Sequence, residues 1–128
     1  MRCGDAVLIP APGGPSIPHL WFLITEPDAV SFQCVMVNVT TLRSHCDRTL
    51  VLQRGEHPFI RHPSVISFAD ARIVDARHIE AGIEAGTMER REPCPPQLLH
   101  LIQDAALASP RTPNKVVALC RRAWGKGG

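Results

Sequence analysis

The stretch that decides the fold is SFQCVMVNV, residues 31–39. When its side chains alternate along a β-strand, Cys34 and Met36 lie on one face, and Val35 and Val37 lie on the other. A strand that is apolar on both faces has to be covered on both sides. We therefore expect this strand to be central, either within a barrel or between two layers.

Short apolar runs separated by Gly, Pro and Asn surround this central strand. They predict further strands over residues 6–9, 19–25, 49–53, 64–68 and 71–75. A segment with four prolines and two glycines, residues 10–18, predicts an exposed loop. Short strands that recur about every ten residues are typical of a small barrel. The predicted fold class is mainly β (α+β), a small antiparallel β-barrel followed by helices.

The C-terminal part of the chain predicts two helices. Apolar residues at helical spacing indicate an amphipathic helix over residues 97–107, with Leu98, Leu101 and Ile102 facing the core. A second helix is expected directly after Thr112, which is suited to be its N-cap. Both helices are expected to pack on the barrel.

The segment between barrel and helices leaves two alternatives. Residues 78–92 fit a helical turn around Ile79 and Ile83, or a hairpin that ends at residues 86–91.

With 128 residues, 45% hydrophobic and 20% charged, the chain has the size and composition of one globular domain. We expect a single domain, with the barrel in residues 1–92 and the helices in residues 93–128.

The cysteines and the apolar runs indicate a soluble, cytoplasmic protein. The five cysteines are odd in number and form no C-x-x-C pair, which favours reduced thiols over a secreted disulfide framework. No apolar run exceeds five residues, whereas a membrane-spanning helix needs about twenty. We expect neither a membrane span nor a secretory signal.

The C-terminal end is basic. After Asp104 it holds five Lys and Arg residues and no acidic residue. Such an end attracts nucleic acid or an acidic partner peptide. Basic residues near the end of a helix also interact favourably with the helix dipole. Both interpretations stay open.

The most unusual stretch is TTLRSHCDRTLVLQRGEHPFIRHPS, residues 40–64, with three of the six histidines and four arginines. Histidine gives and takes protons near neutral pH, and arginine holds phosphate. Metal-free RNA cleavage needs a group that removes the 2′-OH proton, another that protonates the leaving 5′ oxygen, and a cation. Two alternatives stay open: a polar rim in which His57 and His62 fix turns, or a zinc site of Cys46, His57 and His62.

Several segments together resemble the MazF/PemK-type toxins. They are Gly4-Asp5 before the first strand, the Gly/Pro-rich loop, HLWFLIT at 19–25, VNVTT at 37–41, SVISF at 64–68, ARIV at 71–74 and the closing helix. The resemblance covers residues 4–107. It implies a small SH3-like barrel that forms a homodimer and cleaves single-stranded RNA without a metal or other cofactor. It also implies inhibition by an antitoxin protein.

The resemblance also implies a pair of catalytic positions. In the family they are an Arg that opens the second strand, commonly as Arg-Pro, and a Thr or Ser that ends the third. Thr40 or Thr41 matches the second position, whereas His19-Leu20 stands where Arg-Pro is expected. Histidine can do acid–base work, but it lacks the permanent charge and the bidentate fork of arginine.

Hairpin geometry supplies the candidate site. His19 opens one strand and Thr41 and Arg43 follow the next, and the far ends of paired antiparallel strands meet. We therefore expect His19, Thr41 and Arg43 to lie at one mouth of the barrel, as catalytic residues, with His57 or His62 across from them. The residues predicted to bind RNA around them are Thr40, His45, Arg54 and Arg61.

A rival hypothesis comes from another class of protein. The chain is then a non-catalytic SH3-like interaction module whose groove binds a partner peptide. Convergence of the candidate residues on one cleft favours the enzyme, and their scatter favours the binding module.

Overall fold

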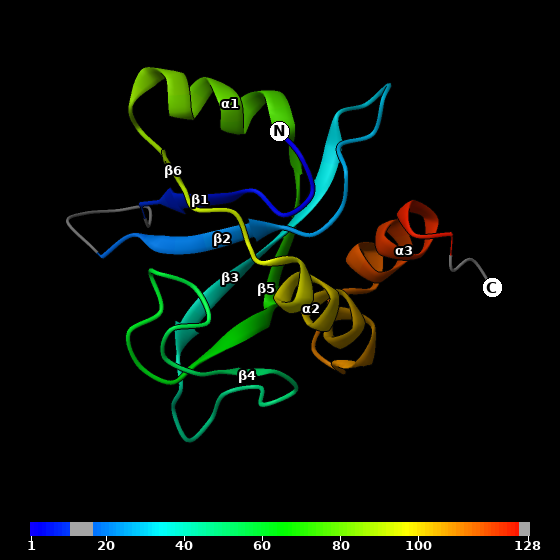
Figure 1. Cartoon of the computed structure of the whole chain (residues 1–128). Helices are drawn as coiled ribbons and strands as arrows, with labels where there is room; N and C mark the ends of the chain where they lie inside the picture. Colours follow the sequence, from blue (N-terminus) through cyan, green and yellow to red (C-terminus); the bar gives the residue numbers. More distant parts are fainter. Residues whose placement is uncertain (11–16, 126–128) are drawn as a thin grey trace.

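The computed structural model describes residues 1–10 and 17–125 (Figure 1). Its strands are β1 (Ala6–Ile9), β2 (His19–Leu23), β3 (Gln33–Thr41), β4 (Val51–Leu52), β5 (Ser64–Asp75) and β6 (Glu89–Arg91). Its helices are α1 (Ala76–Ala85), α2 (Pro96–Ala108) and α3 (Asn114–Ala123). Most of the loop predicted over residues 10–18, and Lys126, lie outside the described residues.

The strands form one antiparallel sheet in the order β4-β5-β3-β2-β1-β6. The sheet is curled into an open half-barrel, with β3 and β5 crossing behind β1 and β2 in the view of Figure 1. The predicted class, a mainly β fold with an antiparallel barrel-like sheet and C-terminal helices, is confirmed. The barrel stays open because β4 and β6 are the two edges of the sheet.

The central strand is β3, as its two apolar faces predict. Val35 and Val37 belong to a large buried cluster on the concave face of the sheet. Cys34 and Met36 belong to a smaller buried cluster on the other face. The alternation of one strand therefore divides the interior into two cores, and each core needs its own cover.

Helices cover the two faces separately (Figure 1). Helix α1 lies over the smaller cluster, to which it contributes Ala76 and Ile79. Helices α2 and α3 lie over the concave face, where Ile102 and Val116 are fully buried. The expectation that the C-terminal helices pack on the sheet is confirmed.

A single long strand, β5, replaces the two strands predicted at 64–68 and 71–75. Met36 of β3 pairs with Arg72, but Asn38 pairs with Ser67, so β5 bulges between these two pairs. Within the bulge the Ser67 hydroxyl donates to the Asp70 carboxylate at 2.7 Å. The bulge bends the strand and lets it follow the curl of the sheet.

The ambiguous segment contains a helix and then a strand. Asp75 caps α1 by accepting a hydrogen bond from the backbone N–H of Arg77 at 2.9 Å. Gly86, with a φ of 81°, ends the helix in the left-handed conformation that glycine adopts without strain. The chain then returns as β6 and pairs with β1. The helical alternative is therefore confirmed, and the hairpin alternative is wrong, because the described strand β6 pairs with the distant β1 and with no strand inside residues 78–92.

Two details of the C-terminal helices differ from the sequence prediction. Leu101 was expected in the core but is 52% exposed, because α2 presents Leu98, Ile102 and Ala105 to the sheet. Thr112 does not cap α3, since its hydroxyl donates to the Ala106 carbonyl at 2.7 Å. Among the described residues, no helix combines the length and the apolar character that crossing a bilayer requires.

A pair of substitutions on α2 tests this orientation. Ile102→Ala removes a fully buried side chain and is expected to lower the free energy of unfolding by about 2–5 kcal/mol. Leu101→Ala, one position earlier, is expected to change it by less than about 0.5 kcal/mol. Urea unfolding followed by circular dichroism measures both. Equal losses for the two variants would contradict the orientation of α2.

Candidate functional site

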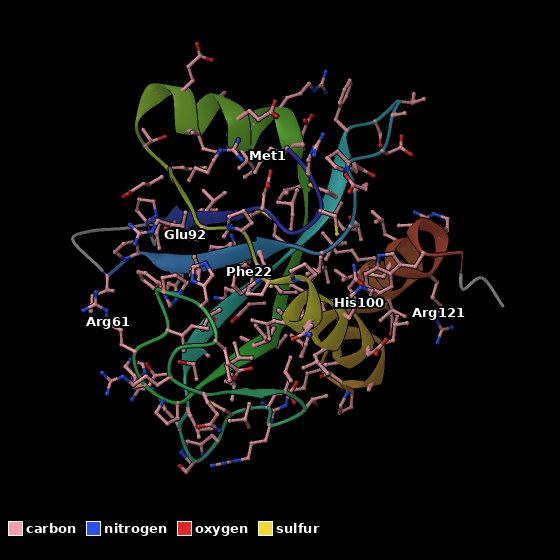
Figure 2. All side chains as sticks on the ribbon, viewed as in Figure 1. Met1, Phe22, Arg61, Glu92, His100 and Arg121 are labelled. Atoms are coloured by element: carbon pink, nitrogen blue, oxygen red, sulfur yellow. The ribbon has the colours of Figure 1, made fainter. Side chains whose placement is uncertain are left out.

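A groove of about 640 Å³ opens at the end of the sheet where β2 begins and β3 ends. Four parts of the chain line it: residues 17–20, the end of β3 with residue 43, the loop at 58–64, and Arg91 of β6. We call it the basic groove. It lies away from α2 and α3, at the end of the sheet where Arg61 extends from its loop (Figure 2).

Strand pairing explains why this end carries the site. β2 and β3 form the predicted hairpin, with Trp21 opposite Asn38 and Leu23 opposite Met36. The first residue of β2 and the last residues of β3 therefore lie at the same end. Thr41 pairs in turn with Ser64, which brings the start of β5 to the same place.

The groove has an apolar floor and a basic rim. Leu20 and Val39 belong to the concave-face core and form part of the floor. The described lining includes three arginines and two histidines and has no Asp or Glu. Within the described residues, neither Arg43 nor Arg61 forms an ion pair with a carboxylate. Such a rim attracts an anionic ligand.

The structure brings six of the nine predicted site residues together in this groove. They are His19, Thr40, Thr41, Arg43, Arg61 and His62. His45 and Arg54 are exposed, and neither residue belongs to the described lining. The predicted cluster of His19, Thr41, Arg43 and His62 is therefore found at one mouth of the half-barrel.

His57 is buried beside the groove and does not face into it. It is 1% exposed. Its Nδ1 accepts from the backbone N–H of Phe59 at 3.0 Å, so its Nε2–H donates to the Glu92 carbonyl oxygen at 2.6 Å. The ring also meets Phe22 edge-on, with centroids 5.5 Å apart. Because both ring nitrogens are hydrogen-bonded, His57 fixes the turn at residues 57–60, as the polar-rim alternative predicts for it.

His62 has the opposite character. It is exposed on the rim of the groove. Its Nδ1 lies 3.3 Å from the Pro63 carbonyl oxygen, which can only accept, so a hydrogen bond here requires the tautomer with the proton on Nδ1. In that tautomer Nε2 is the nitrogen with a free lone pair. His62 is therefore placed to exchange a proton with a ligand in the groove.

The C-terminal helices hold the loop that follows β3. The Ser109 hydroxyl donates to the Asp47 carboxylate, and the Arg111 guanidinium donates to the His45 carbonyl oxygen at 3.3 Å. Burial opposes ionisation of Asp47, but hydrogen bonds from Ser109 and Thr49 outweigh it and lower the pKa of the carboxyl. The backbone that carries Arg43 is thereby tied to the linker between α2 and α3.

The alternative zinc site of Cys46, His57 and His62 is not formed. The Cys46 thiol donates to the Thr41 carbonyl oxygen at 3.5 Å, and His57 has no free nitrogen. In residues 1–10 and 17–125, no three His, Cys, Asp or Glu side chains gather as metal ligands.

Burial also argues against thiol chemistry at the remaining four cysteines. Burial raises the pKa of Cys34 to about 11. Burial and the negative charge of Glu26 together raise the pKa of Cys3 to about 11. Burial raises the pKa of Cys94 and of Cys120 to about 12. A thiol held so far from ionisation is a poor nucleophile at neutral pH.

Sequence reasoning missed two groups in the groove, Arg91 and Phe59. Arg91 enters because β6 pairs with β1, with Arg91 opposite Ala6. Phe59 enters because its ring is only partly buried against the concave-face core. The run of three charged residues in β6 gave no strand signal, so neither its pairing nor its side-chain direction was predictable.

Comparison with known proteins assigns no family to this chain. The chain matches no protein-family model, and no curated protein matches it.

The contrast between the two histidines is testable by stability. His57→Ala removes a buried ring and leaves the Phe59 N–H and the Glu92 carbonyl without their partner. We expect the free energy of unfolding to fall by about 2–5 kcal/mol. His62→Ala, at an exposed position, is expected to change it by less than about 0.5 kcal/mol. Thermal and urea unfolding measure both, and an unchanged stability for His57→Ala would remove its structural role.

Proposed function

We propose that this chain is a MazF/PemK-like toxin-type protein that binds single-stranded RNA and cleaves it without a metal. The observation that carries the proposal is the basic groove, where His19, Thr41, Arg43 and His62 line one concavity free of carboxylates in its described part. Phosphodiesters are anions, and a site rich in Arg and His both attracts them and supplies proton transfer.

The proposed reaction uses the 2′-hydroxyl of the RNA as the nucleophile. Nε2 of His62 takes the 2′-OH proton, and the 2′ oxygen attacks the adjacent phosphorus. The bond from phosphorus to the 5′ oxygen breaks, and His19 in its protonated form gives that oxygen a proton. The products are a 2′,3′-cyclic phosphate and a 5′-hydroxyl. No water molecule enters this step.

The remaining groups act on the phosphate. Arg43 supplies a permanent charge beside the pentacoordinate phosphorus, and its planar fork can bind two phosphate oxygens. The Thr41 hydroxyl can donate to one of them. The arginine expected at the start of β2 is replaced by His19, so this chain relies on Arg43 for the fixed charge. Arg61 and Arg91 extend the positive rim along the strand.

A second candidate function is a peptide-binding module, and the apolar floor of the groove favours it. Above that floor, Ile17, Pro58 and Phe59 offer exposed or half-buried apolar surface that an apolar peptide side chain can contact. The basic rim then selects an acidic peptide. Such a peptide is also the kind of ligand an antitoxin protein would insert to block the groove.

Two further expectations accompany the proposal. Free cysteines at all five positions suit the reducing cytoplasm, where RNA substrates occur. The family that the sequence resembles implies a homodimer, and a two-fold pair is the commonest arrangement of soluble oligomers.

Two substitutions in the groove test the catalytic assignment. His19→Ala and Arg43→Ala are each expected to lower the rate of cleavage of single-stranded RNA by about 10²- to 10⁴-fold. Arg2→Ala is the matched control, because Arg2 is an exposed arginine outside the described lining. The measurement is cleavage of a mixed set of labelled oligonucleotides, with and without a chelator.

The outcomes separate the hypotheses. Full activity in both groove variants contradicts the catalytic roles. No cleavage by the unchanged protein across varied RNA favours the peptide-binding module. Loss of activity with the chelator contradicts the metal-free reaction.

Assembly is tested by mass. We expect light scattering at high micromolar concentration to give twice the chain mass of 14.0 kDa. The isologous pairing that the resemblance implies predicts this value at neutral pH and moderate salt. A monomer mass under the same conditions contradicts the homodimer.

A further inference from the structure

Phe59 is the one phenyl or indole side chain in the described lining of the basic groove. It is partly buried against the concave-face core, and the rest of its ring borders the groove. The rim supplies charge for phosphates, but charge alone does not hold a nucleobase. A partly exposed ring beside a basic rim offers the flat apolar surface on which a base stacks.

Arg91 lies next to this ring. Its guanidinium carbon is 5.8 Å from the centre of Phe59, within the range of a cation–π contact. Pairing of β6 with β1 fixes its backbone, and its guanidinium also donates to Glu89 at 3.2 Å. A planar guanidinium is itself a stacking surface for a base. Two flat groups from distant parts of the chain therefore meet at one place in the groove.

The loop that carries Phe59 is held in place before any ligand arrives. Its backbone closes on itself, with the Gly55 N–H donating to the Ile60 carbonyl at 3.0 Å and the Ile60 N–H to the His57 carbonyl at 2.9 Å. The His57 ring joins the Phe59 N–H to the Glu92 carbonyl. Glu92 follows Arg91 directly, so the same ring ties together the segments that carry the two flat groups. Such preorganisation lowers the entropy lost on binding.

We propose that Phe59 and Arg91 form a stacking site for one unpaired nucleobase of the RNA, beside the phosphate held at Arg43. The site rests on the proposed function, because it serves the same groove and the same strand. It requires a base that is free of its partner, since a paired and stacked base cannot turn onto the ring. The site thus supplies a physical reason for the choice of single strands over duplexes.

The test uses Phe59→Leu, which keeps apolar volume against the core but removes the aromatic face. Phe32→Leu is the matched control, because Phe32 also pairs with an arginine, with the Arg77 guanidinium carbon 4.3 Å from its ring, outside the groove. Binding is measured by fluorescence anisotropy on single strands with 2′-fluoro groups, which lack the attacking hydroxyl. A series of strands carries one abasic position each.

For the unchanged protein, we expect one abasic position to raise the Kd about fivefold or more. Phe59→Leu is expected to raise the Kd of the intact strand by a similar factor and to show no further loss at that abasic position. Phe32→Leu is expected to bind as the unchanged protein does. Melting of each variant checks that the fold is retained.

Three outcomes would overturn the proposal, and they are distinguishable. If the unchanged protein binds RNA and Phe59→Leu binds equally well, the stacking site is wrong and the proposed function stands. If Phe59→Leu weakens every strand equally, the abasic ones included, the ring has a structural role only. If the unchanged protein binds none of the strands, the RNA function fails and the stacking site fails with it.

Discussion

The burial of β3 on both faces is the constraint on which the rest of the structure depends. Its apolar side chains enter two different cores, so helices must cover both faces of the sheet. Its backbone pairs with β2 on one side and β5 on the other. The end of β3 therefore meets the start of both neighbours, and those three ends lie together at the groove. The same strand organises the two cores and this end of the sheet.

The pattern of apolar residues was sufficient to predict β3 and its hairpin with β2, because a short, valine-rich run that is apolar on both faces favours a buried strand. It was insufficient for β5, because the bulge changes which residues face the concave core. Phe68 and Ala71, which both lie between the two pairs that flank the bulge, belong to the same cluster, although three positions separate them. An odd spacing breaks the alternation, so one bent strand gives the signal of two.

The same reasoning explains which site residues were predictable. His19, Thr41 and Arg43 follow from the hairpin, since strand ends are set by the chain order and the turn. His57 and His62 are five residues apart with proline neighbours, and local sequence does not distinguish them. Only the long-range bond from His57 to the Glu92 carbonyl makes one structural and leaves the other free. The position of Arg91 in the groove likewise depends on the pairing of β6, the last strand in the chain, with β1, the first.

The linker between α2 and α3 also supports the groove, although its residues are not part of the described lining. Arg43 has no carboxylate partner among the described residues, so no ion pair within the fold neutralises its charge. Its position depends on the loop behind it, which Asp47 and Ser109 anchor to the linker between α2 and α3. In the proposed function, an anionic ligand supplies the missing partner for the charge of Arg43, which the fold positions but does not neutralise. The loop backbone is thus anchored at Asp47, while the Arg43 guanidinium stays available in the groove. A fixed backbone with a free guanidinium is the arrangement that phosphate recognition requires.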